Sequence, residues 1–228
     1  MNMPGLWSPL IDVWRSAQIS LPSVRCWPSF DPEKNGGIRI QDLLQHSYSL
    51  VLLGRIFVSL LRPHLALDEE LLLTALLLHD QGKAENGFDT PRPSKSDWTE
   101  RREYALFFER YGLFPEPIKT ALQRAFLLQS ALMMTERFPE DARTILNDLR
   151  ISRPMEILAF DAIERWDFVL YALEQYRERK NDIVLTRVLQ HHAGRLDELV
   201  NLLPGFGETI WTSEIRAWKN AFLAGIVD

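Results

Sequence analysis

The sequence predicts an all-α fold: one compact domain built as a bundle of about eight helices. Apolar residues recur at helical spacing along most of the chain, and no convincing stretch alternates between apolar and polar residues as a half-buried strand does. Prolines and glycines bound the apolar segments. The chain has 228 residues, 46% of them hydrophobic. That length and composition suit a single domain with a sizeable core.

The chain divides into an N-terminal segment, residues 1–37, and a helical domain, residues 38–228. The first segment is rich in Pro, Gly and Trp without a sustained period. We therefore expect irregular structure packed on the core, with one short helix near residues 11–18. The domain begins with a long helix over about residues 41–62, and Pro63 ends its apolar pattern.

A second helix begins with the acidic residues 68–70, which the helix dipole favours, and continues through the apolar residues 71–78. Gly82 is the expected end of this helix. Residues 83–96 contain glycine and prolines but few apolar residues, so they predict a surface loop of a length that is often functional. Further helical patterns cover residues 97–111, 117–135, 139–149, 154–179, 182–203 and 209–223.

Composition argues against several classes of protein. The formal charge of −5, from 26 basic and 31 acidic residues, gives no general attraction for nucleic acids or anionic membranes. Cys26 is the only cysteine, so the chain can form neither an internal disulfide nor a multi-thiolate zinc site. The first ten residues do not resemble a secretory signal, and the apolar stretch 49–61 is too short to span a bilayer. We expect a soluble, cytoplasmic protein.

The sharpest chemical feature is His79–Asp80, an imidazole and a carboxylate side by side at the end of an apolar helix. A buried carboxylate is costly unless it is paired or bound to a cation, so a metal is a natural reason for one. His46 lies on the preceding helix in apolar surroundings. Asp161 and Glu164 lie one turn apart on a later helix. We expect the first three residues to bind one divalent metal, with Asp161 or Glu164 as a fourth ligand.

These residues resemble the HD superfamily of metal-dependent phosphohydrolases, whose pattern is a histidine, a His-Asp pair and a distant aspartate. His46, flanked by Gln45 and Ser47, is similar to the family's Glu-His-Ser segment, and the leucines before His79–Asp80 are similar to its apolar run. Residues 163–174 resemble the stretch from the metal aspartate to an Ala-Leu-Glu run. The gapless register puts that aspartate on Glu164, with Asp161 one turn earlier, so both stay candidates.

The resemblance covers most of the chain and implies a mononuclear site. Members with two or more metals draw further histidines from the interval after the His-Asp pair, and this chain has none between Asp80 and Asp161. Nitrogen and oxygen ligands without thiolate suit a cation such as Mn, Fe, Co, Ni or Zn, and Mg is a further candidate.

Within the superfamily the resemblance is greatest to the 5′-deoxynucleotidases, which remove the phosphate of deoxyribonucleoside monophosphates. The segment from Arg25 to Pro28 is similar to their Arg-Trp-Pro, with Cys26 inserted. By this resemblance Arg25 would meet the phosphate and Trp27 the sugar. Those enzymes have a glutamate three residues after the aspartate of the pair, where this chain has Lys83. Here the sequence instead resembles the His-Asp-x-Gly-Lys of other HD phosphohydrolases, whose lysine faces the substrate phosphate.

The resemblance thus implies hydrolysis of a small phosphorylated substrate, with nucleotides the leading class. Asp80 would bridge metal and nucleophile, and Lys83 would offset developing charge. Glu85 or Asp89 of the loop could supply a general acid, although no family motif fixes either one. Similar proteins are usually dimers, so a homodimer is implied. Two alternatives stay open: a non-catalytic HD module that binds a nucleotide or a protein partner, and an HD nuclease, which the negative charge disfavours.

Structural roles are the competing interpretation of several of these residues. A single helical histidine such as His46 is often a hydrogen-bonded core residue. Asp161 and Glu164 would otherwise pair with Arg165 or with an arginine on a neighbouring helix. We expect Asp167 to be structural, and packing is the competing role for Trp27.

Overall fold

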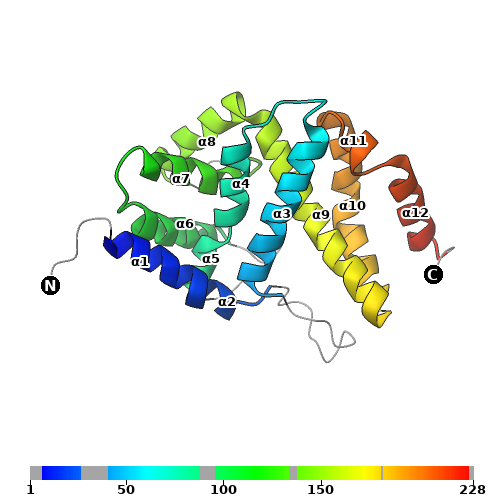
Figure 1. Ribbon diagram of the computed structural model, residues 1–228, viewed down its shortest axis with the longest axis horizontal. Helices are drawn as coiled ribbons and strands as arrows, with labels where there is room; N and C mark the ends of the chain where they lie inside the picture. The colour runs from blue at the N-terminus through cyan, green and yellow to red at the C-terminus, as the bar shows by residue number, and fades with distance from the viewer. Residues whose placement is uncertain (1–6, 27–40, 88–95, 134–137, 181, 226–228) are drawn as a thin grey trace.

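Three helices form the centre of the molecule. Figure 1 shows α3 (Leu43–Leu61) between α4 (Glu69–Leu78) and α9 (Pro154–Arg179), and α3 packs against both. The computed structural model describes residues 7–26, 41–87, 96–133, 138–180 and 182–225. Within these ranges there is no strand, and the only β-type pairing is an isolated bridge between Arg25 and Asp42. The predicted all-α fold is therefore confirmed.

The remaining helices flank this centre, with α1 and α12 towards opposite ends of the molecule (Figure 1). In chain order they are α1 (Trp7–Arg15), the π-helical turn η1 (Ser16–Ser20), α2 (Leu21–Ser23), α5 (Gln81–Asn86), α6 (Asp97–Tyr111), α7 (Ile118–Leu128), α8 (Glu140–Ser152), α10 (Asp182–Leu202), α11 (Phe206–Thr209) and α12 (Ser213–Leu223). The short helices α2, α5 and α11 account for most of the difference from the eight or so that we expected.

Short polar side chains fix where several helices begin. Asp42, Asp68, Ser96 and Thr212 each precede a helix and accept a hydrogen bond from the backbone N–H three residues further on, at 2.8, 3.1, 3.2 and 3.4 Å. Each bond satisfies an N–H that has no partner within the helix. These caps explain why α3, α4 and α6 begin close to the positions expected from the sequence.

Gly82 does not end the second helix, contrary to our expectation. Helix α4 ends at Leu78, the chain turns at His79 and Asp80, and Gly82 lies inside the new helix α5. A Cβ at Gly82 would lie 2.6 Å from the backbone oxygen of Glu103, so the glycine allows α5 to pack closely on α6. The first residues of the expected loop are therefore helical, while residues 88–95 lie outside the described ranges.

The C-terminal helix also differs from its expected range. The sequence predicted one helix over residues 209–223, but α11 ends at Thr209 and α12 begins at Ser213. The side chain of Thr212 caps α12, so the chain has to leave the helical conformation just before it.

The N-terminal segment is helical over residues 7–23, where only one short helix near residues 11–18 was expected, and these helical turns contact α3, α5 and α6. Leu21, Val24 and Cys26 form a small buried cluster with Leu43 of α3 and Ala84 of α5. The backbone N–H of Cys26 donates to the carbonyl of Gln41 at 2.8 Å, and that of Leu43 donates to Val24 at 3.0 Å. The segment therefore holds together the beginnings of the two helices that flank the site described below.

Helix α3 has an unusual distribution of apolar residues. One side is buried against α4 and α9, and Gly54 allows the closest approach, because a Cβ there would lie 2.6 Å from Leu76. By length and composition alone α3 would also suit a membrane span, a test that core helices of soluble proteins pass as well. Its exposed apolar side chains recur at every fourth position: Leu44, Tyr48, Leu52, Ile56 and Leu60.

Candidate metal centre

Three of the expected ligands meet in the interior. His46 lies in the first turn of α3, His79 caps the end of α4, and Asp80 directly precedes α5. The turn between α4 and α5 lets two consecutive side chains face one point, which a continuous helix would not allow. The three residues are 3%, 3% and 1% exposed. One ligand atom from each lies within 4.8 Å of the others.

The spacing of these atoms suits a cation. Asp80 Oδ2 is 3.3 Å from His79 Nε2 and 3.9 Å from His46 Nε2. Two ligands about 2.1 Å from a tetrahedral ion stand roughly 3.4 Å apart, so little adjustment would be needed. The two imidazole rings meet edge to face, with centroids 5.3 Å apart, and therefore do not stack over each other.

Both imidazoles turn the same nitrogen away from the cluster. His79 Nδ1 donates to the backbone carbonyl of Leu76 at 2.9 Å, and His46 Nδ1 donates to Asp167 Oδ2 at 2.8 Å. With the proton on Nδ1, a neutral ring has a lone pair on Nε2, which faces the cluster. Neither His79 Nε2 nor Asp80 Oδ2 has a well-formed hydrogen bond to any described residue. Buried polar atoms without partners are costly, and a shared cation would satisfy both.

Asp80 is ionised in this environment. Burial alone would raise the pKa of its carboxyl, but His79, Lys83 and His46 together hold that pKa well below its usual range. Burial acts to lower the pKa of His46, whereas the hydrogen bond and charge of Asp167, followed by the charge of Asp80, outweigh burial and raise it. The centre thus contains a permanent carboxylate, and its surroundings favour positive charge.

Lys83 lies beside Asp80 in the first turn of α5. Its Nζ is 2.7 Å from Asp80 Oδ1, and its side chain is 19% exposed. One oxygen of Asp80 therefore faces the two histidines and the other faces an ammonium group. An anionic ligand beside the cluster would meet this ammonium as well.

The two expected fourth ligands are not brought to the cluster. Asp161 is buried, and its oxygens accept hydrogen bonds from Arg165 Nε at 2.7 Å and Arg195 Nε at 2.8 Å. For Asp161 the structure therefore shows the competing interpretation, pairing with arginines of α9 and α10. Glu164 is likewise outside the group of potential ligands that the described residues form.

Asp167, which we expected to be structural, is a carboxylate of α9 that contacts the cluster through its hydrogen bond with His46. Phe160 packs on the ring of His79, at 5.8 Å between centroids, and Phe168 stacks on His46 at 5.6 Å. The side of α9 that meets the histidines thus contains residues 160 and 167, seven residues or two turns apart. The same spacing separates buried Ile157 from Glu164, so the sequence has no signal that would have singled out Asp167.

Of the remaining candidates, the structure describes only the side chain of Arg25. Arg25 is exposed, and its backbone bridges to Asp42, one turn before His46. Trp27 and Asp89 lie outside the described residues, as does the side chain of Glu85. No general acid is therefore assigned within the described part of the chain.

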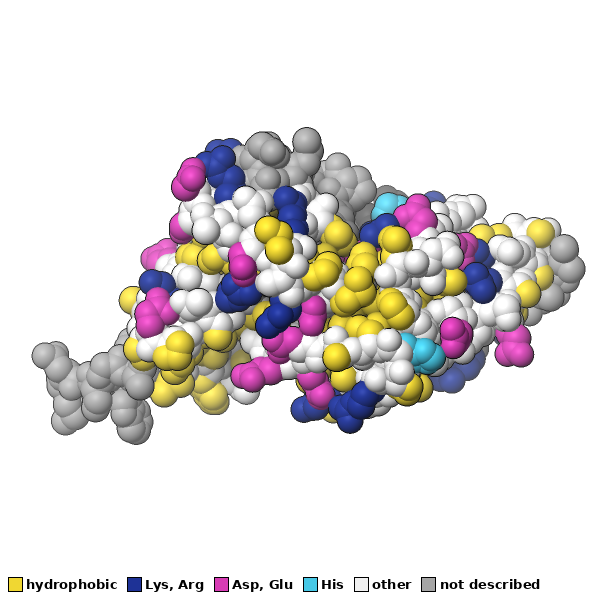
Figure 2. Space-filling view, turned by 90° about the horizontal axis from the view of Figure 1, so that it is seen from above, with side chains coloured by type: hydrophobic (Ala, Val, Ile, Leu, Met, Phe, Trp, Pro, Cys, Tyr) yellow, Lys and Arg dark blue, Asp and Glu magenta, His cyan; other side chains and the backbone are white. Residues whose placement is uncertain are grey.

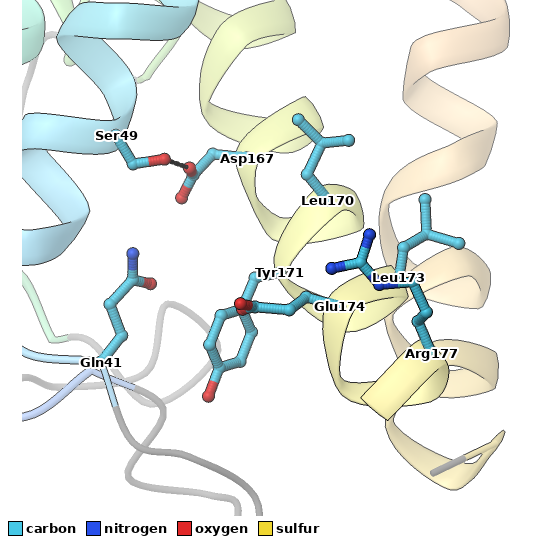
Figure 3. A pocket seen from close by; sticks show the side chains of 8 residues that line it. All are labelled: Gln41, Ser49, Asp167, Leu170, Tyr171, Leu173, Glu174 and Arg177. Carbon is cyan, nitrogen blue, oxygen red and sulfur yellow. Dashed lines mark hydrogen bonds between the residues drawn. The ribbon is translucent and has the colours of Figure 1, made fainter. Parts of the chain in front are cut away.

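A cavity of about 430 Å³ opens beside the cluster. Figure 3 shows Ser49 and Asp167 at one end of it, with Gln41, Tyr171 and Arg177 towards the other. Because Asp167 also binds His46, this carboxylate lies between the cavity and the candidate ligands. The cavity therefore offers room for an organic group close to the centre.

Two imidazole nitrogens and one carboxylate oxygen would leave coordination positions open for water and a substrate oxygen, as in hydrolytic metal sites. The cluster therefore offers the kinds of donor atom that bind hydrolytic cations. Comparison of the chain with models of known protein families, with curated proteins and with solved structures gives no match.

Proposed function

We propose that the protein is a metal-dependent phosphohydrolase of the HD type, which acts on a phosphate ester of a small molecule, most readily a nucleotide. His46, His79 and Asp80 would hold one divalent cation. The observation that supports this most strongly is the meeting of His79 Nε2 and Asp80 Oδ2, which are buried and lack well-formed hydrogen bonds to the described residues. Without a cation that arrangement would cost stability.

Each nearby side chain has a distinct part in the proposed chemistry. A bound divalent cation would supply a Lewis acid and acidify a water molecule. Asp80 would hold the cation and could accept a hydrogen bond from that water. Lys83, held by Asp80 Oδ1 at 2.7 Å, places positive charge where a phosphate group gains negative charge during hydrolysis.

The adjoining cavity supports a small organic substrate. Its volume of about 430 Å³ is within the usual range of small-molecule sites. The lining combines two apolar groups, Leu170 and Leu173, with polar and charged side chains: Gln41, Ser49, Asp167, Tyr171, Glu174 and Arg177. Such a mixed lining suits a sugar or base better than it suits a purely apolar group.

Two other functions have weaker support. A non-catalytic HD module is favoured by the lysine at the position where the nucleotidases have a glutamate. A nuclease is disfavoured by the net charge of −5, and on the face drawn in Figure 2 basic and acidic side chains are mixed rather than gathered into a basic surface. The homodimer and the cytoplasmic location stay predictions.

The proposal is tested by measuring phosphate release from nucleotides, sugar phosphates and oligonucleotides in the presence of Mn²⁺, Co²⁺ or Zn²⁺. We expect release from a small ester by the wild type and none by Asp80→Asn. Asp148→Asn is the matched control, because Asp148 pairs with Arg124 on the surface. Bound metal without turnover would favour the binding module, and release from oligonucleotides alone would favour the nuclease.

A further inference from the structure

Asp167 is tied to the candidate metal centre from the side opposite Asp80. It is 2% exposed, and both of its oxygens have partners. Oδ2 accepts from His46 Nδ1 at 2.8 Å, while Oδ1 accepts from the hydroxyl of Ser49. His46 thus has one ring nitrogen on Asp167 and the other, Nε2, directed at Asp80.

We propose that Asp167 is a positioning residue: it keeps the proton of His46 on Nδ1 and so presents the unprotonated Nε2 to the cation. A neutral imidazole has two tautomers, and a fixed acceptor beside one nitrogen selects between them. A carboxylate in this position also makes the opposite nitrogen a stronger ligand. The tautomer claim concerns the metal-free protein, whereas the claim about the cation rests on the proposed function.

The neighbouring rings restrict the orientation of the imidazole. Phe168, next to Asp167 in the chain, stacks on the ring of His46 with an interplanar angle of 18°, and His79 meets that ring edge-on. A flip of the ring about the Cβ–Cγ bond would put Cδ2 in the place of Nδ1 and Cε1 in the place of Nε2, so both nitrogens would leave their present positions. The hydrogen bond from Nδ1 to Asp167 therefore favours the orientation that the structure shows.

Ser49 holds the carboxylate in turn. It lies on α3 three residues after His46, on the same face of the helix. Its hydroxyl occupies Oδ1 of Asp167, which leaves Oδ2 for His46, as the dashed line in Figure 3 illustrates. Both Ser49 and Asp167 line the cavity, so the arrangement also forms the boundary between the cavity and His46.

Asp161 provides a matched control on the same helix. Like Asp167 it is buried, and both of its oxygens accept hydrogen bonds, but its partners are Arg165 and Arg195 rather than a histidine. Replacement of either aspartate by asparagine removes a buried negative charge from α9. Only the change at Asp167 should alter His46.

The experiment measures the tautomer of His46 by long-range ¹H–¹⁵N correlation NMR in metal-free protein, at a pH above the raised pKa of His46 so that the ring is neutral, and Zn²⁺ affinity by competition with a chelator. In the wild type and in Asp161→Asn we expect the Nδ1–H tautomer of His46. In Asp167→Asn that tautomer should lose population, and the dissociation constant for Zn²⁺ should rise about 10- to 100-fold. Ser49→Ala should produce a smaller change in the same direction.

An unchanged tautomer and unchanged Zn²⁺ affinity in Asp167→Asn would overturn the proposal, and so would an equal loss in Asp161→Asn. If Asp167→Asn does not fold, Ser49→Ala decides, because loss of one hydroxyl should preserve the fold, and wild-type behaviour there counts against the role. A wild type that binds no divalent cation would refute the proposed function. The tautomer would then still decide whether Asp167 orients His46.

Discussion

Replacement of Lys83 should affect the reaction of the substrate without weakening the binding of the metal. Its ammonium lies 2.7 Å from Asp80 and partly reaches the surface. In Lys83→Met the centre loses a positive charge, so cation affinity should stay the same or increase. Turnover should fall about 100-fold, because the developing charge on the phosphate loses its nearest ammonium group. Steady-state kinetics beside a metal titration would measure both effects.

Lys119→Met is the control for this change. Lys119 pairs with Glu116 on the surface, away from the centre, so its replacement should alter neither quantity. Undiminished turnover in Lys83→Met would show that the lysine has only a structural role beside Asp80.

At the residue scale, the sequence identified His46, His79 and Asp80, which lie together, but not the neighbouring carboxylate of Asp167 on α9. The sequence pattern around His46 and His79–Asp80 predicted their proximity, and the structure brings them together. The Ala-Leu-Glu run set the register of α9 on Glu164, whereas the rotation of α9 against α3 and α4 decides which carboxylate faces inward. That rotation depends on Phe160 and Phe168 packing on the histidines, which the family pattern does not encode.

At the scale of elements, a substitution at Gly82 tests how closely α5 must pack on α6 beside the site. In Gly82→Ala the new Cβ would lie 2.6 Å from the backbone oxygen of Glu103, so α5 would have to move. We expect the free energy of unfolding to fall by about 1–3 kcal/mol. Cation affinity should also decrease, because α5 begins directly after Asp80. Urea denaturation and a metal titration measure the two effects.

Gly194→Ala is the comparison within another helix. A Cβ there would meet nothing within 4 Å, and Gly194 lies inside α10. Because alanine favours a helix over glycine by about 1 kcal/mol, this variant should be slightly more stable than the wild type. Equal effects of the two substitutions would contradict the close packing at Gly82.

Element boundaries were predictable where a local signal fixed them. Helices α6 and α9 have the expected range, and α3 and α10 differ by only a residue or two, because caps, prolines and long apolar periods mark their ends. Helix α5 was missed because Gly82 has the usual signature of a helix end. A glycine is needed at position 82 because α5 packs against the backbone of α6. That contact joins residues far apart in the sequence, so local sequence rules do not predict it.

At the scale of the whole molecule, a polar network joins the C-terminal helix α12 to α10. Asp197 of α10 accepts from the indole N–H of Trp211 at 2.7 Å and from Lys219 of α12 at 2.5 Å. Asp197→Asn would leave the largely buried ammonium of Lys219 without its counter-ion. The free energy of unfolding should fall by about 2 kcal/mol, less than for a fully buried pair because Asp197 is 38% exposed.

The double variant Asp197→Asn with Lys219→Met separates the pair from its surroundings. Removal of both charges should restore part of the lost stability, because no unpaired ammonium remains. Urea denaturation of the three variants gives the coupling energy, and a double variant as unstable as the sum of the two single changes would argue against the pair.

The proposed metal centre depends on three side chains sharing one cation, His46 from α3 and His79 and Asp80 from the turn between α4 and α5. Elemental analysis of purified protein, after incubation with a divalent cation and removal of the excess, tests this most directly. We predict about one ion per chain in the wild type and in His191→Ala, whose histidine is exposed, and none in His79→Ala. Equal metal content in the wild type and His79→Ala would contradict the account.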